Sequence, residues 1–207
     1  MSDQYTAQEE RLNIITHAIG IPLGIVALLL MVLKSDDNTA IVSSLFFGIS
    51  LIVLYSASTL YHAAKSPIRR HKLRILDHSA IYILIAGTYT PLCLIILKGP
   101  TGHLVFGVVW GLALCGIVLK LFFTGRFKVL STILYVLMGW IAAFVYRPIY
   151  ENLSVEGIEW ILAGGISYTT GAILYSIKKI PYNHAVFHCF VLGGSFCHFI
   201  AVYSFVL

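Results

Sequence analysis

The chain has 207 residues, of which 58% are hydrophobic and only 11% are charged. Soluble domains carry about 25% charged residues, so this composition excludes an ordinary soluble protein and indicates an integral membrane protein. The formal net charge of +5 would suit a nucleic-acid-binding protein, but the basic residues are distributed as in a membrane protein.

Seven stretches are apolar enough to cross a membrane as helices, since the hydrocarbon core of a bilayer needs about 20 helical residues. In chain order they are Leu12–Leu33, Thr39–Ala63, Ile75–Leu97, His103–Phe123, Val129–Arg147, Ile158–Ile177 and His184–Leu207. The connections are short, so we expect residues 1–207 to form a single domain. The sequence predicts an all-α integral membrane protein with a bundle of seven transmembrane helices.

Lysine and arginine are divided unequally between the two sides of this predicted bundle. Eleven of the fourteen lie toward the side of the N-terminus, in its loops or, for Lys120, near the end of the fourth span, and only Lys34, Lys98 and Arg147 lie on the other. Positively charged loops stay in the cytoplasm, which predicts a cytoplasmic N-terminus, an outside C-terminus and a multi-pass protein of the plasma (inner) membrane. The basic loop "KSPIRRHKLR" is expected to face anionic lipids, so no nucleic-acid partner is needed to explain the charge.

Polar residues gather at one predicted depth of the bundle. His184 and His188 are four residues apart, so their side chains project from one face of the last helix. With the predicted orientation this pair lies at the cytoplasmic end. The second span ends there with His62, one turn after Ser58, and the third begins there with Asp77. Imidazoles are costly in hydrocarbon unless something binds them.

This set of residues predicts a bound zinc ion. Three neutral imidazoles and an open position form a catalytic zinc site, in which the pKa of bound water falls to about 7. We therefore expect His62, His184 and His188 to bind Zn2+, with interfacial histidines as the alternative. Asp77 is expected to orient or deprotonate the water or to support an imidazole N–H, and Ser58 to hydrogen-bond water or substrate. No H-E-x-x-H motif is present, which excludes a soluble-metalloprotease mechanism.

The remaining histidines receive other assignments. His198 lies roughly 21 Å along the helix from the first histidine of the pair and cannot bind the same ion. It is expected to hydrogen-bond a neighbouring helix, with a proton or substrate path as the alternative. His17 is expected near the cytoplasmic end without binding the ion. His78 points about 100° away from the neighbouring aspartate, and His71 and His103 are expected to be solvated.

Four motifs follow one another along the chain: "EERLN" before the first span, "SASTLYH" ending the second, "LDHSAIYILIAGTYTP" opening the third and "PYNHAVFHCFVLGGSFCHF" in the last. In these motifs the chain resembles the bacterial hemolysin III family, the prokaryotic branch of the progestin and adipoQ receptor group that includes the adiponectin receptors. The resemblance covers essentially the whole chain and implies seven spans with the N-terminus inside.

The resemblance also implies a zinc ion held by three histidines, one from the second helix and two from the seventh, beside an aspartate of the third. Matched motif by motif these are His62, His184, His188 and Asp77, with Ser58 beside them. Glu10 and Asn13 match an acidic-Asn element whose role the family leaves open, and capping of the first helix is the simplest role for them.

Three functions are consistent with these observations. The first is a zinc-dependent intramembrane hydrolase of a lipid amide or ester, as the ceramidase activity ascribed to relatives implies, with Asp77 as base. The second is a cytolytic protein, as the family name implies, although pore formers are usually exported, soluble and amphipathic. The third is a sensor of membrane-lipid state with structural zinc. We expect a zinc-binding hydrolase or lipid-homeostasis factor that works on membrane lipids.

Overall fold

The structure is a computed structural model that describes residues 5–207, and every regular element in that range is a helix, as predicted. The helices are α1 (Ala7–Lys34), α2 (Asn38–Ala63), α3 (Pro67–Pro91), α4 (Gly99–Phe123), α5 (Lys128–Gly139), α6 (Tyr146–Asn152), α7 (Val155–Ser176) and α8 (Asn183–Ala201). The π-helical segments Leu92–Leu97 and Val202–Val206 extend α3 and α8, and the 3-10 segment Ile141–Val145 joins α5 to α6.

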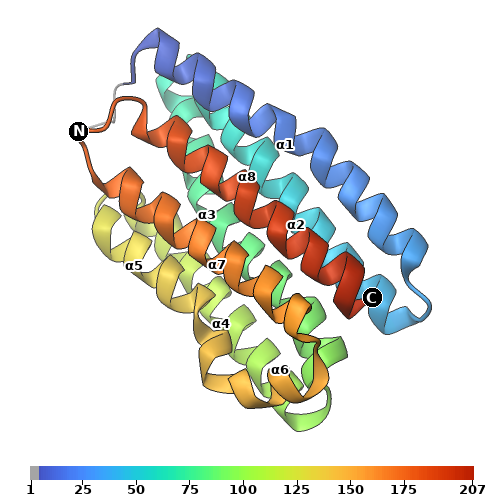
Figure 1. Ribbon diagram of the computed structural model, residues 1–207. Coiled ribbons are helices and arrows are strands. Elements are labelled where there is room, and N and C mark those ends of the chain that lie inside the picture. The colour runs from blue at the N-terminus through green and yellow to red at the C-terminus, as the bar shows by residue number, and fades with distance from the viewer. Residues whose placement is uncertain (1–4) are drawn as a thin grey trace.

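The long helices run side by side in one bundle (Figure 1). Helix α2 packs against α1 and α3, and α8 packs against α7 and α1. Helix α1 begins at one end of the bundle, whereas the chain ends at the other (Figure 1). The first turns of α1, α3 and α8 and the last turn of α2 therefore share one end of the molecule, and this end carries the predicted site.

Within the part of the chain that the structure describes, six segments are long and apolar enough to cross a membrane: Ala7–Lys34, Asn38–Ala63, Pro67–Leu97, Gly99–Phe123, Val129–Asn152 and Asn183–Val206. Helix α7, predicted as the sixth span, is not among them, and its centre carries the polar run Ser167, Tyr168, Thr169 and Thr170. The all-helical class is thus confirmed. The count of seven crossings and the orientation of the termini stay predictions.

The predicted fifth span is broken into two helices. Helix α5 ends at Gly139, and the chain continues through a 3-10 segment to α6. The hydroxyl of Tyr89, on α3, donates to the Gly139 carbonyl at 2.7 Å and accepts from the Ala142 amide at 2.8 Å. A backbone group without a partner is costly in an apolar bundle, so this side chain makes the break possible.

Helix α3 begins at Pro67 rather than at the predicted Ile75. The basic stretch between the second and third spans is therefore largely helical and not a loop. Proline is favoured in the first turn because its missing N–H would have no helical partner there. Its fixed φ also suits the helix, which explains the early start.

A capping box begins α1. The Thr6 hydroxyl accepts from the Glu9 amide at 3.2 Å, and the Glu9 carboxylate accepts from the Thr6 amide at 2.7 Å. Glu10 and Asn13, for which capping was the simplest role, are left for other contacts. Further along α1, a Cβ on Gly20 would lie 2.5 Å from Cγ of the Tyr55 ring, so glycine lets α1 approach α2 closely.

Candidate metal centre

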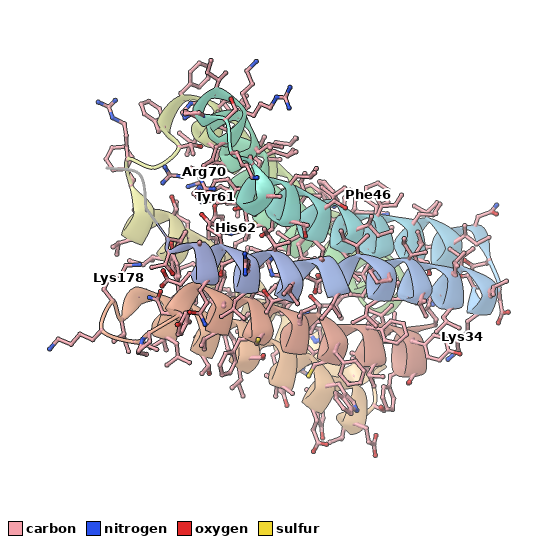
Figure 2. The ribbon with its side chains drawn as sticks, turned by 90° about the horizontal axis from the view of Figure 1, so that it is seen from above. Lys34, Phe46, Tyr61, His62, Arg70 and Lys178 are labelled. Atoms are coloured by element: carbon pink, nitrogen blue, oxygen red, sulfur yellow. The ribbon has the colours of Figure 1, made fainter. Side chains whose placement is uncertain are left out.

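The three predicted metal ligands lie together at one end of the bundle. His62 is in the last turn of α2, and His184 and His188 are in the first two turns of α8. One ring nitrogen from each comes within 4.8 Å of the others. The Nε2 atoms of His62 and His184 are 3.0 Å apart. Figure 2 shows His62 near Tyr61 and Arg70, far from Lys34 at the other end.

Helix α1 occupies the second nitrogen of two of these rings. Nδ1 of His62 lies 2.7 Å from the Glu10 carboxylate. Nδ1 of His188 lies 3.3 Å from the Asn13 carbonyl oxygen and 3.1 Å from the Thr16 hydroxyl. Carboxylate and carbonyl oxygens only accept hydrogen bonds, so both Nδ1 atoms carry the proton and both Nε2 atoms keep their lone pairs.

The spacing of these nitrogens fits a small cation with imidazole ligands. A tetrahedral zinc ion with Zn–N bonds of about 2.0–2.1 Å separates its ligand nitrogens by about 3.3 Å. This value lies between two separations in the cluster. The Nε2 atoms of His62 and His184 are 3.0 Å apart, and the ligand nitrogens of all three histidines are at most 4.8 Å apart. Nδ1 of His184 has no hydrogen-bond partner among the described residues. The three residues could therefore hold a metal ion.

Glu10 connects the histidine cluster to the start of α3. One of its carboxylate oxygens accepts from His62, and the other accepts from the Arg70 guanidinium. That guanidinium also lies over the Tyr61 ring, 4.8 Å from its centroid. The sequence left the role of Glu10 open. The "EERLN" motif, which contains this residue, was the feature of the sequence that singled it out. Its role in the structure is to hold His62.

His17 lies beside the cluster, at the expected end of the bundle, and it is outside the group of three candidate ligands. Its ring stacks on His188 with the centroids 3.5 Å apart and the planes 13° apart. Neither ring nitrogen of this buried side chain has a hydrogen-bond partner among the described residues. His17 therefore fixes the plane of the His188 ring through stacking.

Asp77 and Ser58 are both buried at the same end of the bundle. Asp77 lines a cavity of about 180 Å³ together with His184 and His188, and it is not part of the ligand group. The Ser58 hydroxyl lies next to the Asp77 carboxyl but completes no hydrogen bond among the described residues. The structure thus places Asp77 on the cavity that the histidines open into, with Ser58 behind it.

The remaining histidines are placed as follows. Nε2 of His198 donates to the Ile161 carbonyl of α7 at 3.1 Å, which is the expected hydrogen bond to a neighbouring helix. His78 lines the same cavity as Asp77, which its angular offset from that residue did not suggest. His71 and His103 are exposed, as expected.

The cavity continues away from the histidine cluster between α3, α5, α7 and α8. It reaches Tyr89, Trp140 and His198, and these three residues also line a second cavity of about 360 Å³. The second cavity has mostly apolar walls, including Leu92 and Ile149. Space for an apolar chain therefore extends from the histidine cluster along the bundle.

Comparison with known proteins shows the family of the chain. The family model described as Haemolysin-III related matches residues 5–199. Hemolysin-3 of Bacillus cereus is 45% identical over 203 residues, which cover 97% of this chain and 93% of the relative. The Hemolysin-3 homolog of Bacillus subtilis (strain 168) is 46% identical over 201 residues, covering 96% and 94%. The human Monocyte to macrophage differentiation factor is 28% identical over 207 residues, covering 97% and 86%. With a family match over nearly its whole length, the chain belongs to the Haemolysin-III related family of multi-pass membrane proteins.

Proposed function

We propose that this chain binds Zn2+ through His62, His184 and His188 and hydrolyses a lipid amide or ester inside the membrane. One observation carries the proposal: three imidazole nitrogens, two of them from buried side chains and one from a half-buried side chain, converge within 4.8 Å. The Nδ1 atoms of His62 and His188 are taken by α1, which leaves their Nε2 atoms for a metal. Imidazole ligands suit zinc among the available divalent metals.

Bound zinc would supply a Lewis acid for the substrate carbonyl and lower the pKa of a water molecule. The chain's own residues do the rest. Asp77, on the wall of the shared cavity, takes the proton of the attacking water and passes it to the leaving nitrogen or oxygen. The products are a carboxylic acid and an amine or alcohol. Ser58, beside the Asp77 carboxyl, has a hydroxyl that completes no bond among the described residues and is free to hydrogen-bond the water or the substrate, and the apolar cavity beyond holds the acyl chain and excludes other water.

The proposed topology puts this site at the cytoplasmic side. The excess of lysine and arginine on the side of the N-terminus supports a cytoplasmic N-terminus. Helix α1 starts at one end of the bundle and the chain ends at the other (Figure 1). This arrangement suits an odd number of crossings. Helix α7, the sixth predicted span, then brings the number of crossings to seven.

A non-catalytic role as a lipid-state sensor is the second candidate. It is favoured by the way the cluster ties three helices together: His62 from α2, His184 and His188 from α8, and their partners from α1. An ion at this point would act as a clamp on the bundle. Cytolysis, the third candidate, is supported by the name Hemolysin-3 of the bacterial relatives.

Metal analysis of the purified protein tests the proposal, together with a screen of lipid amides and esters with and without a chelator. We expect about one zinc ion per chain and a hydrolysis that the chelator abolishes. His62→Ala should lose the zinc, whereas His71→Ala, at an exposed histidine of the same end, should keep it. Full zinc content in His62→Ala would refute the site. Full zinc in the wild type with no hydrolysis would favour the clamp.

A further inference from the structure

A buried lysine lines the cavity next to the metal centre. Lys120, in the last turn of α4, is only 6% exposed. Its ammonium donates to the Ser131 hydroxyl and lies 5.6 Å from the centroid of the Tyr135 ring. Within residues 5–207, no carboxylate lies within ion-pair distance of it. A cation buried in a membrane helix is costly, and such residues are typical of substrate and ion sites.

A second cation lines the same cavity. Arg74, in the second turn of α3, is close enough to Lys120 for the two charges to repel each other. Its guanidinium lies against the α4–α5 loop, where a Cβ on Gly125 would be 2.9 Å from a guanidinium nitrogen. Gly125 has a φ of +84°, which glycine adopts without strain, so the loop closes over this side chain.

The charges on the cavity wall do not balance. Its charged side chains, among the described residues, are Arg74, Lys120 and Asp77. Asp77 interacts with Arg74 across one turn of α3, so it offsets one of the two positive charges. Among the described residues, Lys120 makes its contacts with the neutral side chains of Ser131 and Tyr135, and the nearby charge of Arg74 repels it. An anion placed between Lys120 and Arg74 would remove the repulsion and complete the site.

The position of the two cations indicates the kind of anion. Both lie at the end of the bundle that also carries Arg69, Arg70 and Lys72, which is the depth of lipid headgroups in the proposed orientation. Arginine and lysine with a serine hydroxyl match a phosphate, whose several oxygens accept hydrogen bonds at once. The apolar part of the cavity starts beside them and suits an acyl chain.

We propose that Arg74 and Lys120 form a binding site for the phosphate of an anionic lipid headgroup next to the histidine cluster. This inference rests on the proposed function only for the membrane orientation, and it names the class of lipid that the site accepts. It is tested by binding and not by turnover. A protein that binds the lipid without hydrolysing it would keep this inference and remove the hydrolase.

The experiment follows thermal unfolding of the purified full chain in a neutral detergent while phosphatidic acid is added. A ligand that binds only the folded protein raises Tm as its concentration rises. The wild type and Lys120→Arg, which keeps the charge, should show this rise. Lys120→Gln should need at least about tenfold more lipid to reach the same rise in Tm, because a charge-assisted hydrogen bond to the phosphate is lost. Lys65→Gln, at an exposed lysine of the same end, should respond like the wild type.

Every outcome bears on the proposal. Equal responses of Lys120→Gln and the wild type would overturn it, and the Tm of Lys120→Gln without lipid shows that the variant is folded. Phosphatidylcholine, whose phosphate is balanced by a cationic headgroup, should raise Tm much less. An equal rise with oleate would overturn the preference for phosphate. An equal rise with inorganic phosphate would overturn the lipid as its source.

Discussion

The carboxylate of Glu10 lies 2.7 Å from Nδ1 of His62, across the contact between α1 and α2. The same carboxylate accepts from Arg70 of α3, so one acidic side chain joins three helices at the histidine cluster. A hydrogen bond at Nδ1 fixes both the tautomer and the direction of the ring. The first turns of α1 thereby decide how His62 presents its Nε2 atom.

Glu10→Gln should weaken zinc binding about 10–100-fold, because the amide replaces a charged acceptor that orients the His62 ring. Competition with a chelator of known affinity measures the change. Glu9→Gln is the matched control, since glutamine also serves in a capping box and the Glu9 carboxylate bonds the Thr6 amide and not a histidine. Equal zinc affinity of Glu10→Gln and the wild type would mean that this hydrogen bond does not support the metal.

Asp77→Asn should keep most of the zinc but lose about 10²–10⁴ in the rate of lipid hydrolysis, as is usual when a general base is removed. His188→Ala should lose zinc and hydrolysis together, since a three-ligand site cannot spare a ligand. Zinc content and hydrolysis are measured side by side on both variants. An Asp77→Asn protein that hydrolyses lipid at the wild-type rate would rule out Asp77 as the base.

A reporter fused after Leu207 should behave as a periplasmic or extracellular protein. The reason is the asymmetry of lysine and arginine, which holds the N-terminal side in the cytoplasm, combined with seven crossings. Reporter activity in the cytoplasm would mean an even number of crossings. Helix α7 would then be the segment that does not cross the membrane, because the six apolar segments do not include it.

Tyr89→Phe should lower the free energy of unfolding by about 1–3 kcal/mol, because the Gly139 carbonyl and the Ala142 amide lose their shared partner in an apolar setting. Thermal or denaturant unfolding in detergent measures the loss. Tyr146→Phe removes the same hydroxyl from a side chain that is 53% exposed and should be nearly neutral. Equal stability of the two variants would show that the break between α5 and α6 does not depend on Tyr89.

The sequence by itself determined two things about this protein: the local geometry of each helix, and the end of the bundle at which each residue lies. Long apolar stretches predicted the helices, because a chain without water must satisfy its backbone internally. The spacing of His184 and His188 placed both rings on one helix face, since residues four apart lie above each other. The order of the spans placed His62 and Asp77 at the same end as this pair. These features depend only on local geometry and on direction along the chain.

Other features depend on how the helices turn toward each other, and only the tertiary structure decided them. Membrane helices are apolar toward lipid as well as toward their neighbours, so their sequences do not reveal which face packs inward. The bond between Glu10 and His62, the stacking of His17 on His188, and the Tyr89 hydroxyl at the break after α5 all follow from such packing. The pairing of Lys120 with Arg74 on one cavity wall has the same origin. Each of these contacts joins two helices, and it forms only when both helices are turned the right way about their axes. Contacts between helices, such as the close approach of Gly20 to Tyr55, set this rotation. The order of residues along one helix does not.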